Sequence, residues 1–332
     1  MLKVGINGFG RIGRLMFRSS WKQHNSFQVV AVNDLADNAT LAHLLKYDSN
    51  YGIFEHDVSV KGDNLTVDGK EIRVLSEKDP ARLPWKELGV DVVIEATGIF
   101  RARKDAAKHL DAGAGKVVVS APAGDADIMT VLGVNEEKYQ PDKHHVISNA
   151  SCTTNALAPV AKVLQDNFGL RKGLMNTTHA YTNDQVIMDQ PHSDLRRARG
   201  GAVSIIPTST GAAKAVGKVI PELNGVVDGF AVRVPTATVS LVDLVAELEK
   251  EVTSEEINRV FQKEAEKSKV LDFNDEPLVS ADYKGNPYSS VVDGISTMVV
   301  GGNMARVVAW YDNEWAYSCR VGDLVDYMAS KA

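Results

Sequence analysis

The sequence predicts an α/β chain with two different halves: an N-terminal domain built on a parallel sheet, then an α+β domain with a mainly antiparallel sheet. In the first half, strand-like runs alternate with helical runs, and residues 90–96 and 116–121 are mainly apolar, as in strands buried on both faces. In the second half, residues 229–234 and 238–249 alternate apolar and polar side chains, which is typical of antiparallel strands with one covered face. The 332 residues allow about two domains of roughly 150 residues each.

The composition argues against several classes of protein. The 37 basic and 43 acidic residues give a net charge of -6, which disfavours nucleic acid or an anionic membrane as the main partner. The two cysteines, Cys152 and Cys319, are too few for a disulfide framework and fit a reducing compartment. The first residues lead straight into a strand-like run without a long apolar segment. We therefore expect a cytoplasmic protein with no membrane span, and we expect no metal site.

A glycine-rich turn lies between the first strand and the first helix. The strand is 2–7, the glycines of the G-x-G-x-x-G motif are Gly8, Gly10 and Gly13, and the helix is 14–23. In this context the backbone can approach a pyrophosphate at the helix N-terminus. A second strand, 27–33, ends in Asp34, some twenty residues further on, where a carboxylate accepts hydrogen bonds from a ribose and repels a 2′-phosphate. Together these features predict a Rossmann dinucleotide-binding domain that prefers NAD to NADP; the alternative is a glycine-rich turn with a solvated acid.

The alternation of strands and helices continues to about residue 121. The expected elements are a helix at 41–47, a pair of hairpins within 58–75 that turns at 68–69, a strand at 90–96, a helix at 101–110 and a strand at 116–121. Ligands of such sheets bind beyond the carboxyl ends of the strands, which places Thr97 and Ser120 near the expected cofactor. Each of these residues could instead simply terminate its strand.

A polar turn carries Cys152 into the first turn of a helix. A short strand at 144–147 precedes it, and the apolar residues of 153–168 are spaced for one helix face. Unpaired backbone N–H groups and the positive end of the dipole favour an anion there, so we expect the pKa of Cys152 to lie below the ~8.5 of a free cysteine. Cys152 is thus a candidate nucleophile, although many free cysteines are simply small buried apolar side chains.

The lengths of the helix after Cys152 and of the next strand predict which residue could act as a base for the thiol. The helix 153–168 advances roughly 25 Å, and the strand 172–179 returns over about the same distance. We therefore expect His179 to lie beside Cys152. A purely structural histidine is the alternative.

The segment 181–210 is longer than the roughly 12 to 15 residues of an ordinary loop, which indicates a functional or disordered segment. Apolar residues within it favour order. Its arginines, in the run 196–199, could be solvated, contact another subunit or bind an anion. The segment 210–214 then opens a short helix whose N-terminus also suits an anion.

The remaining elements complete the second domain. Thr253 and Glu256 form a capping box for a helix that is expected to cover the sheet. Further strands are expected at 289–293, 296–300 and 305–311, followed by a helix from 314.

Seven blocks of this sequence resemble one known family from end to end. They are Asn7–Arg14 (NGFGRIGR), Ser151–Asn155 (SCTTN), His179–Gln185 (HAYTNDQ), Asp194–Arg199 (DLRRAR), Ile206–Ala215 (IPTSTGAAKA), Arg233–Thr236 (RVPT) and Tyr311–Trp315 (YDNEW). Together they resemble the glyceraldehyde-3-phosphate dehydrogenases. The resemblance implies NAD-dependent oxidative phosphorylation of D-glyceraldehyde 3-phosphate to 1,3-bisphosphoglycerate. In this reaction Cys152 forms a hemithioacetal and then a thioester, and His179 acts as the base.

The resemblance also implies binding roles. Thr182 and Arg233 would hold the substrate phosphate, and the attacking inorganic phosphate would be held by Ser151, Thr153, Arg197, Thr210 and Gly211. The cofactor contacts would comprise Gly8, Gly10, Arg11, Ile12, Gly13, Asp34, Lys78, Thr97, Ser120 and Asn313. Lys78 occupies a position near the adenine that often holds arginine in the family.

The family's organisation implies a homotetramer in which the loop 181–210 packs between subunits. The NAD-binding domain is expected to comprise 1–149 and 313–332, because the last helix returns to it, and the catalytic domain 150–312. Three other functions remain open: an erythrose-4-phosphate dehydrogenase that releases a free acid, an RNA-binding or regulatory protein that keeps the fold, and a cysteine hydrolase. The hydrolase leaves the NAD motif unexplained.

Overall fold

The computed structural model describes residues 1–23 and 26–331 and divides into two compact units. Unit 1 comprises Met1–Thr130, Glu137–Ala150 and Ser318–Ala332, and unit 2 comprises Val131–Glu136 and Ser151–Tyr317. The last segment of the chain thus groups with the N-terminal unit. Relative to the expected division, residues 131–136 and 313–317 fall in unit 2.

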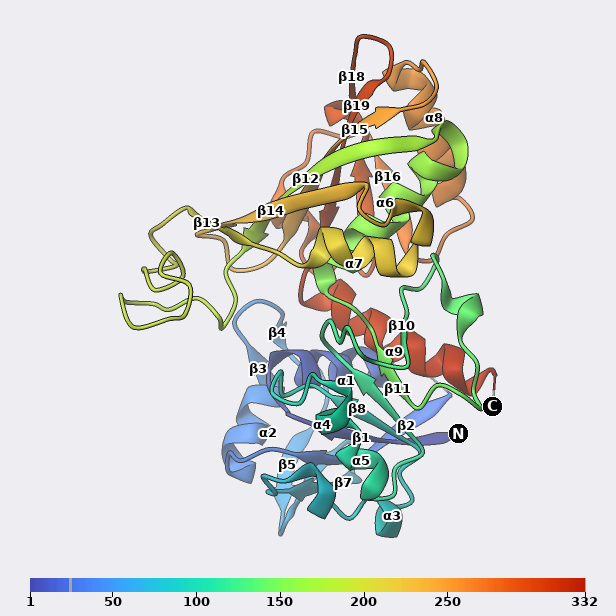
Figure 1. Cartoon of the computed structure of the whole chain (residues 1–332). Coiled ribbons are helices and arrows are strands. Elements are labelled where there is room, and N and C mark those ends of the chain that lie inside the picture. The colour runs from blue at the N-terminus through green and yellow to red at the C-terminus, as the bar shows by residue number, and fades with distance from the viewer. Residues whose placement is uncertain (24–25, 332) are drawn as a thin grey trace. The chain divides into compact units, whose positions relative to one another are not determined.

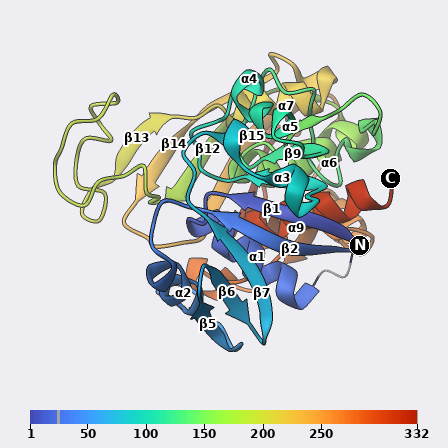
Figure 2. The same ribbon diagram turned by 90° about the horizontal axis from the view of Figure 1, so that it is seen from below.

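In its described residues, unit 1 contains a nine-stranded sheet with the order β10-β11-β9-β8-β1-β2-β7-β6-β5, part of which is visible in Figure 2. All neighbours from β10 to β7 are parallel, and the two hairpins β5-β6-β7 are antiparallel. The predicted parallel sheet is therefore confirmed. The strands are β1 (Leu2–Asn7), β2 (Phe27–Asn33), β5 (Val58–Lys61), β6 (Asn64–Val67), β7 (Lys70–Leu75), β8 (Val92–Glu95), β9 (Lys116–Val119), β10 (Ile128–Met129) and β11 (Val146–Ser148). A separate short pair is β3 (Tyr47–Asp48) with β4 (Gly52–Ile53).

The helices of unit 1 include those that the sequence predicts, with some shifted bounds, and a short unpredicted helix at Trp85–Leu88. They are α1 (Arg11–Gln23), α2 (Asn38–Lys46), α3 (Trp85–Leu88), α4 (Arg103–Ala106), α5 (Lys108–Asp111) and α9 (Trp315–Ala329), of which α9 joins this unit from Ser318 onward. Helix α1 begins at Arg11, directly after the glycine turn, rather than at residue 14. The single helix expected at 101–110 is two short helices that meet at Ala107.

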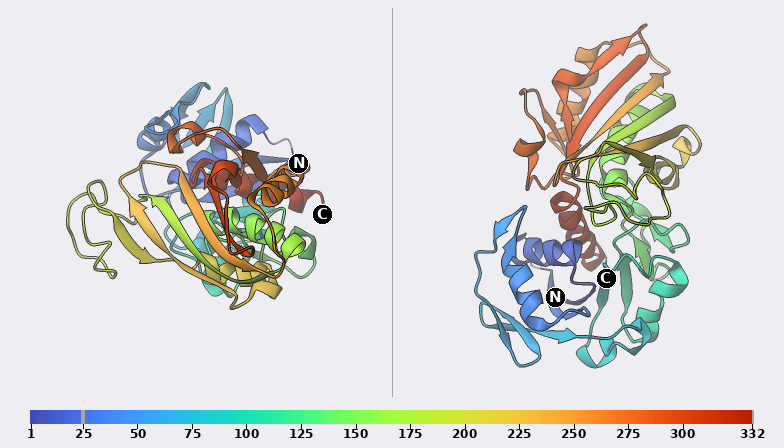
Figure 3. Two further views of the ribbon diagram at one scale, coloured as in Figure 1. Left: turned by 90° about the horizontal axis from the view of Figure 1, so that it is seen from above. Right: turned by 90° about the vertical axis from the view of Figure 1, so that its left-hand side faces the viewer.

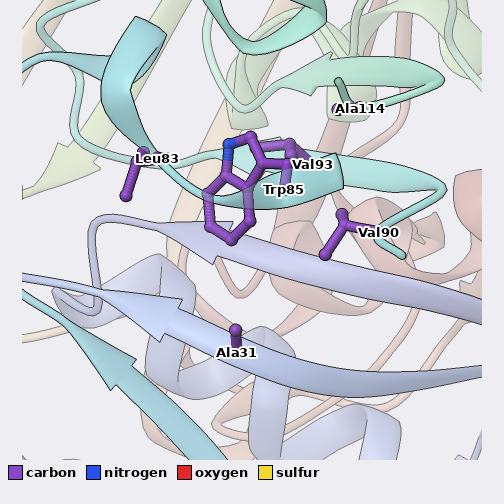
Figure 4. Packing of buried hydrophobic residues seen from close by; sticks show 6 residues of the cluster. All are labelled: Ala31, Leu83, Trp85, Val90, Val93 and Ala114. Carbon is purple, nitrogen blue, oxygen red and sulfur yellow. The ribbon is translucent and has the colours of Figure 1, made fainter. Parts of the chain in front are cut away.

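One core cluster of unit 1 is built around Trp85, which is completely buried among Leu83, Val90, Val93 and Ala114 (Figure 4). Its indole N–H is not left unpaired, because Nε1 donates to Nδ1 of a buried histidine of α5 at 2.9 Å. Burying a large aromatic side chain is worth a few kcal/mol only if its polar atom keeps a partner, and this arrangement meets both conditions.

In the described chain, unit 2 contains an eight-stranded sheet with the path β13-β14-β12-β15-β19-β17-β16, and β18 also pairs with β19 (Figure 1). The pairs β12–β14 and β16–β17 are parallel and the others are antiparallel, which confirms a mainly antiparallel sheet. The strands are β12 (Leu170–Ala180), β13 (Ile206–Ser209), β14 (Val227–Val234), β15 (Ser240–Leu248), β16 (Leu271–Asn274), β17 (Ser290–Asp293), β18 (Met298–Val300) and β19 (Met304–Tyr311).

The α-helices of unit 2 pack against one face of this sheet. Helix α6 (Cys152–Phe168) contacts β12, β15, β17 and β19, α7 (Ala212–Val219) contacts β14, and α8 (Ser254–Ala265) contacts β16. The predicted capping box of α8 is present, with the Thr253 side chain accepting from Glu256 N at 3.2 Å and Glu256 accepting from Thr253 N at 2.9 Å. On the opposite face of the sheet, Leu174, Phe230 and Val245 remain exposed.

The long loop 181–210 is ordered by its own hydrogen bonds. Gly201 N donates to Val186 O at 2.8 Å, and Gln190 N donates to Ala198 O at 3.0 Å. The loop extends from the sheet of unit 2 in the left panel of Figure 3, and its last residues form β13. In the part of the chain that the structure describes, no helix combines the length and the apolar character needed to span a bilayer.

Candidate active site

The N-terminus of α6 positions Cys152. Ser151 is the N-cap, and its hydroxyl accepts a hydrogen bond from Thr154 N at 3.0 Å. The preceding residue, Ala150, adopts the left-handed conformation with φ of 56°. A non-glycine residue in this region is strained by about 1 kcal/mol or more, and such strain is common next to functional groups.

His179 lies beside the thiol, as the sequence predicted. Its Nε2 is 3.5 Å from Cys152 Sγ. Helix α6 carries the chain away from Cys152, and β12 brings it back to His179. The second ring nitrogen, Nδ1, lies 2.6 Å from Ala180 O and 2.7 Å from Nη1 of Arg233. Arg233 reaches it because β14 pairs with β12 in a register that places Arg233 opposite His179.

The predicted lowering of the Cys152 pKa was wrong. The residue keeps some exposed surface, but the surroundings of its sulfur are dry, and this burial raises the pKa of the thiol above its ordinary value, while nearby Arg233 acts in the opposite direction. Burial, assisted by Arg233, lowers the pKa of His179 to about 3. Both groups are therefore neutral near pH 7. Desolvation outweighs the helix N-terminus, a balance that the sequence pattern could not reveal.

The residues assigned to the substrate phosphate lie near the ends of β12 and β14. Besides its contact with His179, Arg233 donates to Ala180 O at 3.1 Å, and its Nε has no partner within the described residues. Thr182 N donates to Gln185 Oε1 at 2.8 Å, so a side chain of the long loop holds this residue. The ends of the two strands are joined by a hydrogen bond from Tyr181 N to Thr236 O at 3.1 Å.

The residues assigned to the second phosphate surround the N-termini of α6 and α7, two helices that pack together. Ser151 and Thr153 belong to α6. At α7, the N-cap is Gly211, and a Cβ built on it would meet nothing within 4 Å. Thr210 accepts from Ala212 N at 3.2 Å. This arrangement suits an anion, because first-turn N–H groups point outward from a helix.

Arg197 is already engaged in this structure. Its Nε donates to Thr208 Oγ1 at 2.8 Å and its Nη2 to Ser209 O at 3.2 Å, while Nη1 pairs with Asp184. Arg197 is therefore not simply solvated, which was one of the three alternatives for the arginine run 196–199. Asp184 had no assigned role in the sequence, and it neutralises part of the charge that Arg197 would offer to an anion.

The glycine turn of unit 1 has the properties that a bound pyrophosphate requires. Gly8 has a positive φ of 91°, which only glycine adopts readily, and it forms the tight turn after β1. A Cβ on Gly13 would lie 2.2 Å from Gly8 O, so glycine permits the close packing of α1 on the turn. A Cβ on Gly10 would meet nothing within 4 Å, which leaves space for a ligand against the backbone. The turn thus fits a dinucleotide.

Asp34 lies directly against this turn. Its carboxylate accepts from Phe9 N at 2.9 Å and from Ala36 N at 3.1 Å. Arg11 and Ile12 lie in the first turn of α1, but the guanidinium of Arg11 is paired with Asp48 at 3.0 Å. The expected pyrophosphate contact by Arg11 would compete with this ion pair.

The other expected cofactor residues are distributed over both units. Thr97 and Ser120 follow β8 and β9 and share one partner, because Thr97 N donates to Glu95 Oε1 at 2.8 Å and Ser120 Oγ donates to Glu95 O at 3.0 Å. Lys78 is exposed in the loop after β7. Asn313 belongs to unit 2, where Ser240 Oγ donates to its Oδ1 at 2.9 Å.

The sequence reasoning missed two residues, Tyr311 and Thr177, whose hydroxyl groups connect to Thr153. Tyr311 OH lies 2.8 Å from Thr153 Oγ1 and 3.0 Å from Thr177 Oγ1, and its ring meets the His179 ring edge-on at 6.0 Å. Two signals were available. Tyr311 opens the YDNEW block, and Thr177 precedes His179 by two residues on a strand, which places both on the same face. In residues 1–23 and 26–331 no group of three or more His, Cys, Asp or Glu side chains could hold a metal ion.

Comparisons with known proteins place this geometry in a family. Residues 2–103 match the family model for the glyceraldehyde 3-phosphate dehydrogenase NAD binding domain, and residues 151–313 match the model for the C-terminal domain. The chain is 61% identical over 332 residues to a glyceraldehyde-3-phosphate dehydrogenase of Geobacillus stearothermophilus, with 99% of each chain covered. It is 59% identical to glyceraldehyde-3-phosphate dehydrogenase 1 of Bacillus subtilis, again with 99% of each chain covered. The predicted NAD cofactor is thereby confirmed, and the chain belongs to the glyceraldehyde-3-phosphate dehydrogenase family.

Proposed function

We propose that this protein oxidises D-glyceraldehyde 3-phosphate with NAD and inorganic phosphate to 1,3-bisphosphoglycerate. One observation carries the chemistry: Cys152 Sγ lies 3.5 Å from Nε2 of a buried, neutral His179 at the start of α6. A nucleophile within reach of an unprotonated base can capture an aldehyde as a hemithioacetal. Family membership supports this substrate and the requirement for inorganic phosphate.

His179 accepts the proton that the thiol loses when the sulfur attacks the carbonyl carbon. For this the lone pair must be on Nε2, which requires the tautomer whose Nδ1–H donates to Ala180 O. Arg233 donates toward the same Nδ1 and therefore favours the other tautomer. A substrate phosphate that draws Arg233 toward itself removes this competition, so substrate binding and base activation support one another.

The Gly8–Gly13 turn and Asp34 would hold NAD, which when bound would supply the two-electron oxidant needed to turn the hemithioacetal of Cys152 into a thioester. In the second half of the reaction, inorganic phosphate attacks this thioester, and residues of the chain bind the phosphate. The N-termini of α6 and α7, with Ser151, Thr153, Thr210 and Gly211, hold inorganic phosphate for attack on the thioester carbonyl. His179 carries the proton of the thiol by then and gives it to the Cys152 sulfur as the carbon–sulfur bond of the thioester breaks. Asn313, whose Oδ1 accepts from Ser240 Oγ, would contact the carboxamide of the nicotinamide.

The test is NADH formation from glyceraldehyde 3-phosphate with and without inorganic phosphate. We expect wild-type turnover to require phosphate or arsenate, Cys152→Ser to lose nearly all activity while it still binds NAD, and Cys319→Ser to behave as wild type. Cys319 is the matched control because it is the second cysteine and is fully buried. Undiminished turnover without phosphate would instead indicate release of a free acid, as in an erythrose-4-phosphate dehydrogenase.

We also propose that the protein acts as a homotetramer in the cytoplasm. The loop 181–210 and the open face of the unit 2 sheet expose more apolar side chains than isolated surface residues would explain; they include Ile187, Met188, Leu195, Val203, Ile205, Leu174 and Phe230. Self-association would cover them. The cytoplasm would keep Cys152 reduced, and the proposed chemistry needs a free thiol at that position.

A further inference from the structure

A buried network of polar side chains joins the ends of neighbouring strands in unit 1. Its centre is Glu95, the last residue of β8, which is 2% exposed. Asn7 Nδ2 donates to Glu95 Oε2 at 2.6 Å, and His109 Nε2 lies 3.0 Å from the same oxygen. The other oxygen, Oε1, accepts from Thr97 N at 2.8 Å and from the Thr97 hydroxyl. This carboxylate thus has a donor for each of its roughly four lone pairs.

One end of the network is fixed by Trp85. Its indole Nε1 can only donate, so His109 Nδ1 must accept, at a distance of 2.9 Å. The ring of His109 therefore carries its own proton on Nε2 and donates it to Glu95. Trp85 and His109 are both 0% exposed, so bulk water does not compete for these two hydrogen bonds.

The other end is fixed by the backbone of Glu77. Its N–H donates to Asn33 Oδ1 at 2.8 Å, and its carbonyl accepts from Asn33 Nδ2 at 2.9 Å. The same Nδ2 donates to Asn7 Oδ1 at 2.7 Å, so the group of Asn7 that faces Glu95 is its Nδ2. Donors therefore reach position 95 from both ends of the network. Only a carboxylate, which accepts on both oxygens, matches all of them.

Stability alone does not explain why a carboxylate is buried here. Backbone pairing already holds β1 to β2 and to β8 up to the last residue of each strand. Buried charged groups can often be replaced by apolar side chains without loss of stability. The network lies where the chain leaves the sheet, and each strand leads there to an expected cofactor residue: Gly8 after β1, Asp34 after β2, Lys78 after β7 and Thr97 after β8.

We propose that Glu95 is a positioning residue for NAD, which holds the segments after β1, β2 and β8 in the spacing that the cofactor needs. Thr97 illustrates how it acts. The Thr97 hydroxyl donates its one proton to Glu95 and accepts from Ile99 N at 3.0 Å, so it shapes the turn after β8 and has no proton left for the cofactor. Glu95 acts on NAD through such neighbours, and a well-ordered site loses less entropy on binding.

The test is the dissociation constant for NAD, measured by calorimetry without aldehyde or phosphate. Glu95→Gln keeps the size of the side chain, but its amide nitrogen faces donors in place of one of the two oxygens. We expect NAD to bind about tenfold more weakly at a temperature at which the variant is fully folded. Loss of a negative charge would by itself favour the anionic pyrophosphate, so weaker binding reports on positioning. The control Val92→Ala shortens a buried side chain on the other face of β8 and should lower stability but leave the NAD affinity unchanged.

A second variant tests the directions of the hydrogen bonds. Asn7→Asp combined with Glu95→Gln exchanges the amide and the carboxylate and keeps the net charge. The new carboxylate at position 7 can accept from the new amide at position 95 and from Asn33, and it replaces an atom that lies 3.4 Å from His109 Nε2. We expect this variant to recover most of the NAD affinity that Glu95→Gln loses.

Unchanged or tighter NAD binding in folded Glu95→Gln would overturn the inference, because a merely structural network lowers stability and leaves the affinity alone. A double variant that binds no better than Glu95→Gln would also contradict it. The titrations involve no turnover. A wild-type protein that binds NAD but does not oxidise glyceraldehyde 3-phosphate would contradict the proposed function and leave the role of Glu95 to be decided by these affinities.

Discussion

At the scale of single residues, dry surroundings decide the behaviour of the catalytic pair. A histidine exposed to water is half protonated near pH 6.5, whereas burial and Arg233 keep His179 neutral down to about pH 3. Neutrality at working pH is what a proton acceptor needs. The acidic limit of activity should therefore not arise from protonation of His179 in the free enzyme.

This difference also makes stability depend on pH. Between about pH 3 and 6.5 the unfolded chain binds one proton at His179 that the folded chain does not, so stability falls as the pH decreases through this window and is unaffected above it. The contribution is about 1.4 kcal/mol per pH unit. Urea unfolding at fixed protein concentration between pH 4 and 7 should give a shallower dependence for His179→Gln than for wild type. The control His43→Gln replaces an exposed histidine; equal slopes for wild type and His179→Gln would contradict the buried neutral state.

Asp34 should determine the choice between the two nicotinamide dinucleotides. Asp34→Asn keeps the size of the side chain and an oxygen that can accept from Phe9 N, but it removes the charge that repels a 2′-phosphate. We expect the ratio of kcat/KM for NAD over NADP to fall by one to two powers of ten, roughly 1.4 to 3 kcal/mol of discrimination. Steady-state kinetics with both cofactors measure this ratio, and an unchanged ratio would assign the discrimination to another residue.

At the scale of elements, two glycines of the turn between β1 and α1 have different roles. Gly13 permits close packing of the helix, and Gly10 leaves space for the cofactor. Gly13→Ala would place a methyl group 2.2 Å from Gly8 O, so α1 must shift and the protein should lose at least 1 kcal/mol of stability, on the order of an overpacked core. Gly10→Ala meets nothing within 4 Å and should fold normally, yet bind NAD at least tenfold more weakly, because its methyl group occupies the approach to the pyrophosphate. Thermal unfolding and NAD titration distinguish the two variants. Wild-type NAD affinity in Gly10→Ala would show that the dinucleotide does not lie against this turn.

At the scale of the whole molecule, the exposed apolar residues predict self-association. Val203, in the long loop, is 84% exposed, so Val203→Asp should cost a monomeric chain almost nothing but should weaken an assembly that buries it. Sedimentation should show a lower mass for this variant than for wild type. Val60→Asp is the control, because Val60 is 42% exposed on β5 and belongs to unit 1, whereas the long loop and the open sheet face belong to unit 2. Equal masses for wild type and Val203→Asp would exclude the loop from the interface.

The sequence by itself determined the local features of this protein. The glycine turn, the capping box of α8, the bounds of β1 and β2 and the return of the chain from Cys152 to His179 all follow from periodicity, turn chemistry and element length, which a short stretch of residues encodes. The resemblance of seven blocks then identified the family.

Only the tertiary structure decided what depends on residues far apart in the chain. The short strands β13 and β16 exist because β14 and β17 provide partners for their backbone groups, and β13 even contains a proline at its edge position. The pKa of Cys152 depends on Arg233 of β14, and the Thr153 hydroxyl meets Tyr311 of β19, so both depend on strands far from α6 in the sequence. Desolvation and hydrogen-bond direction are properties of the packed surroundings, and no local pattern specifies them.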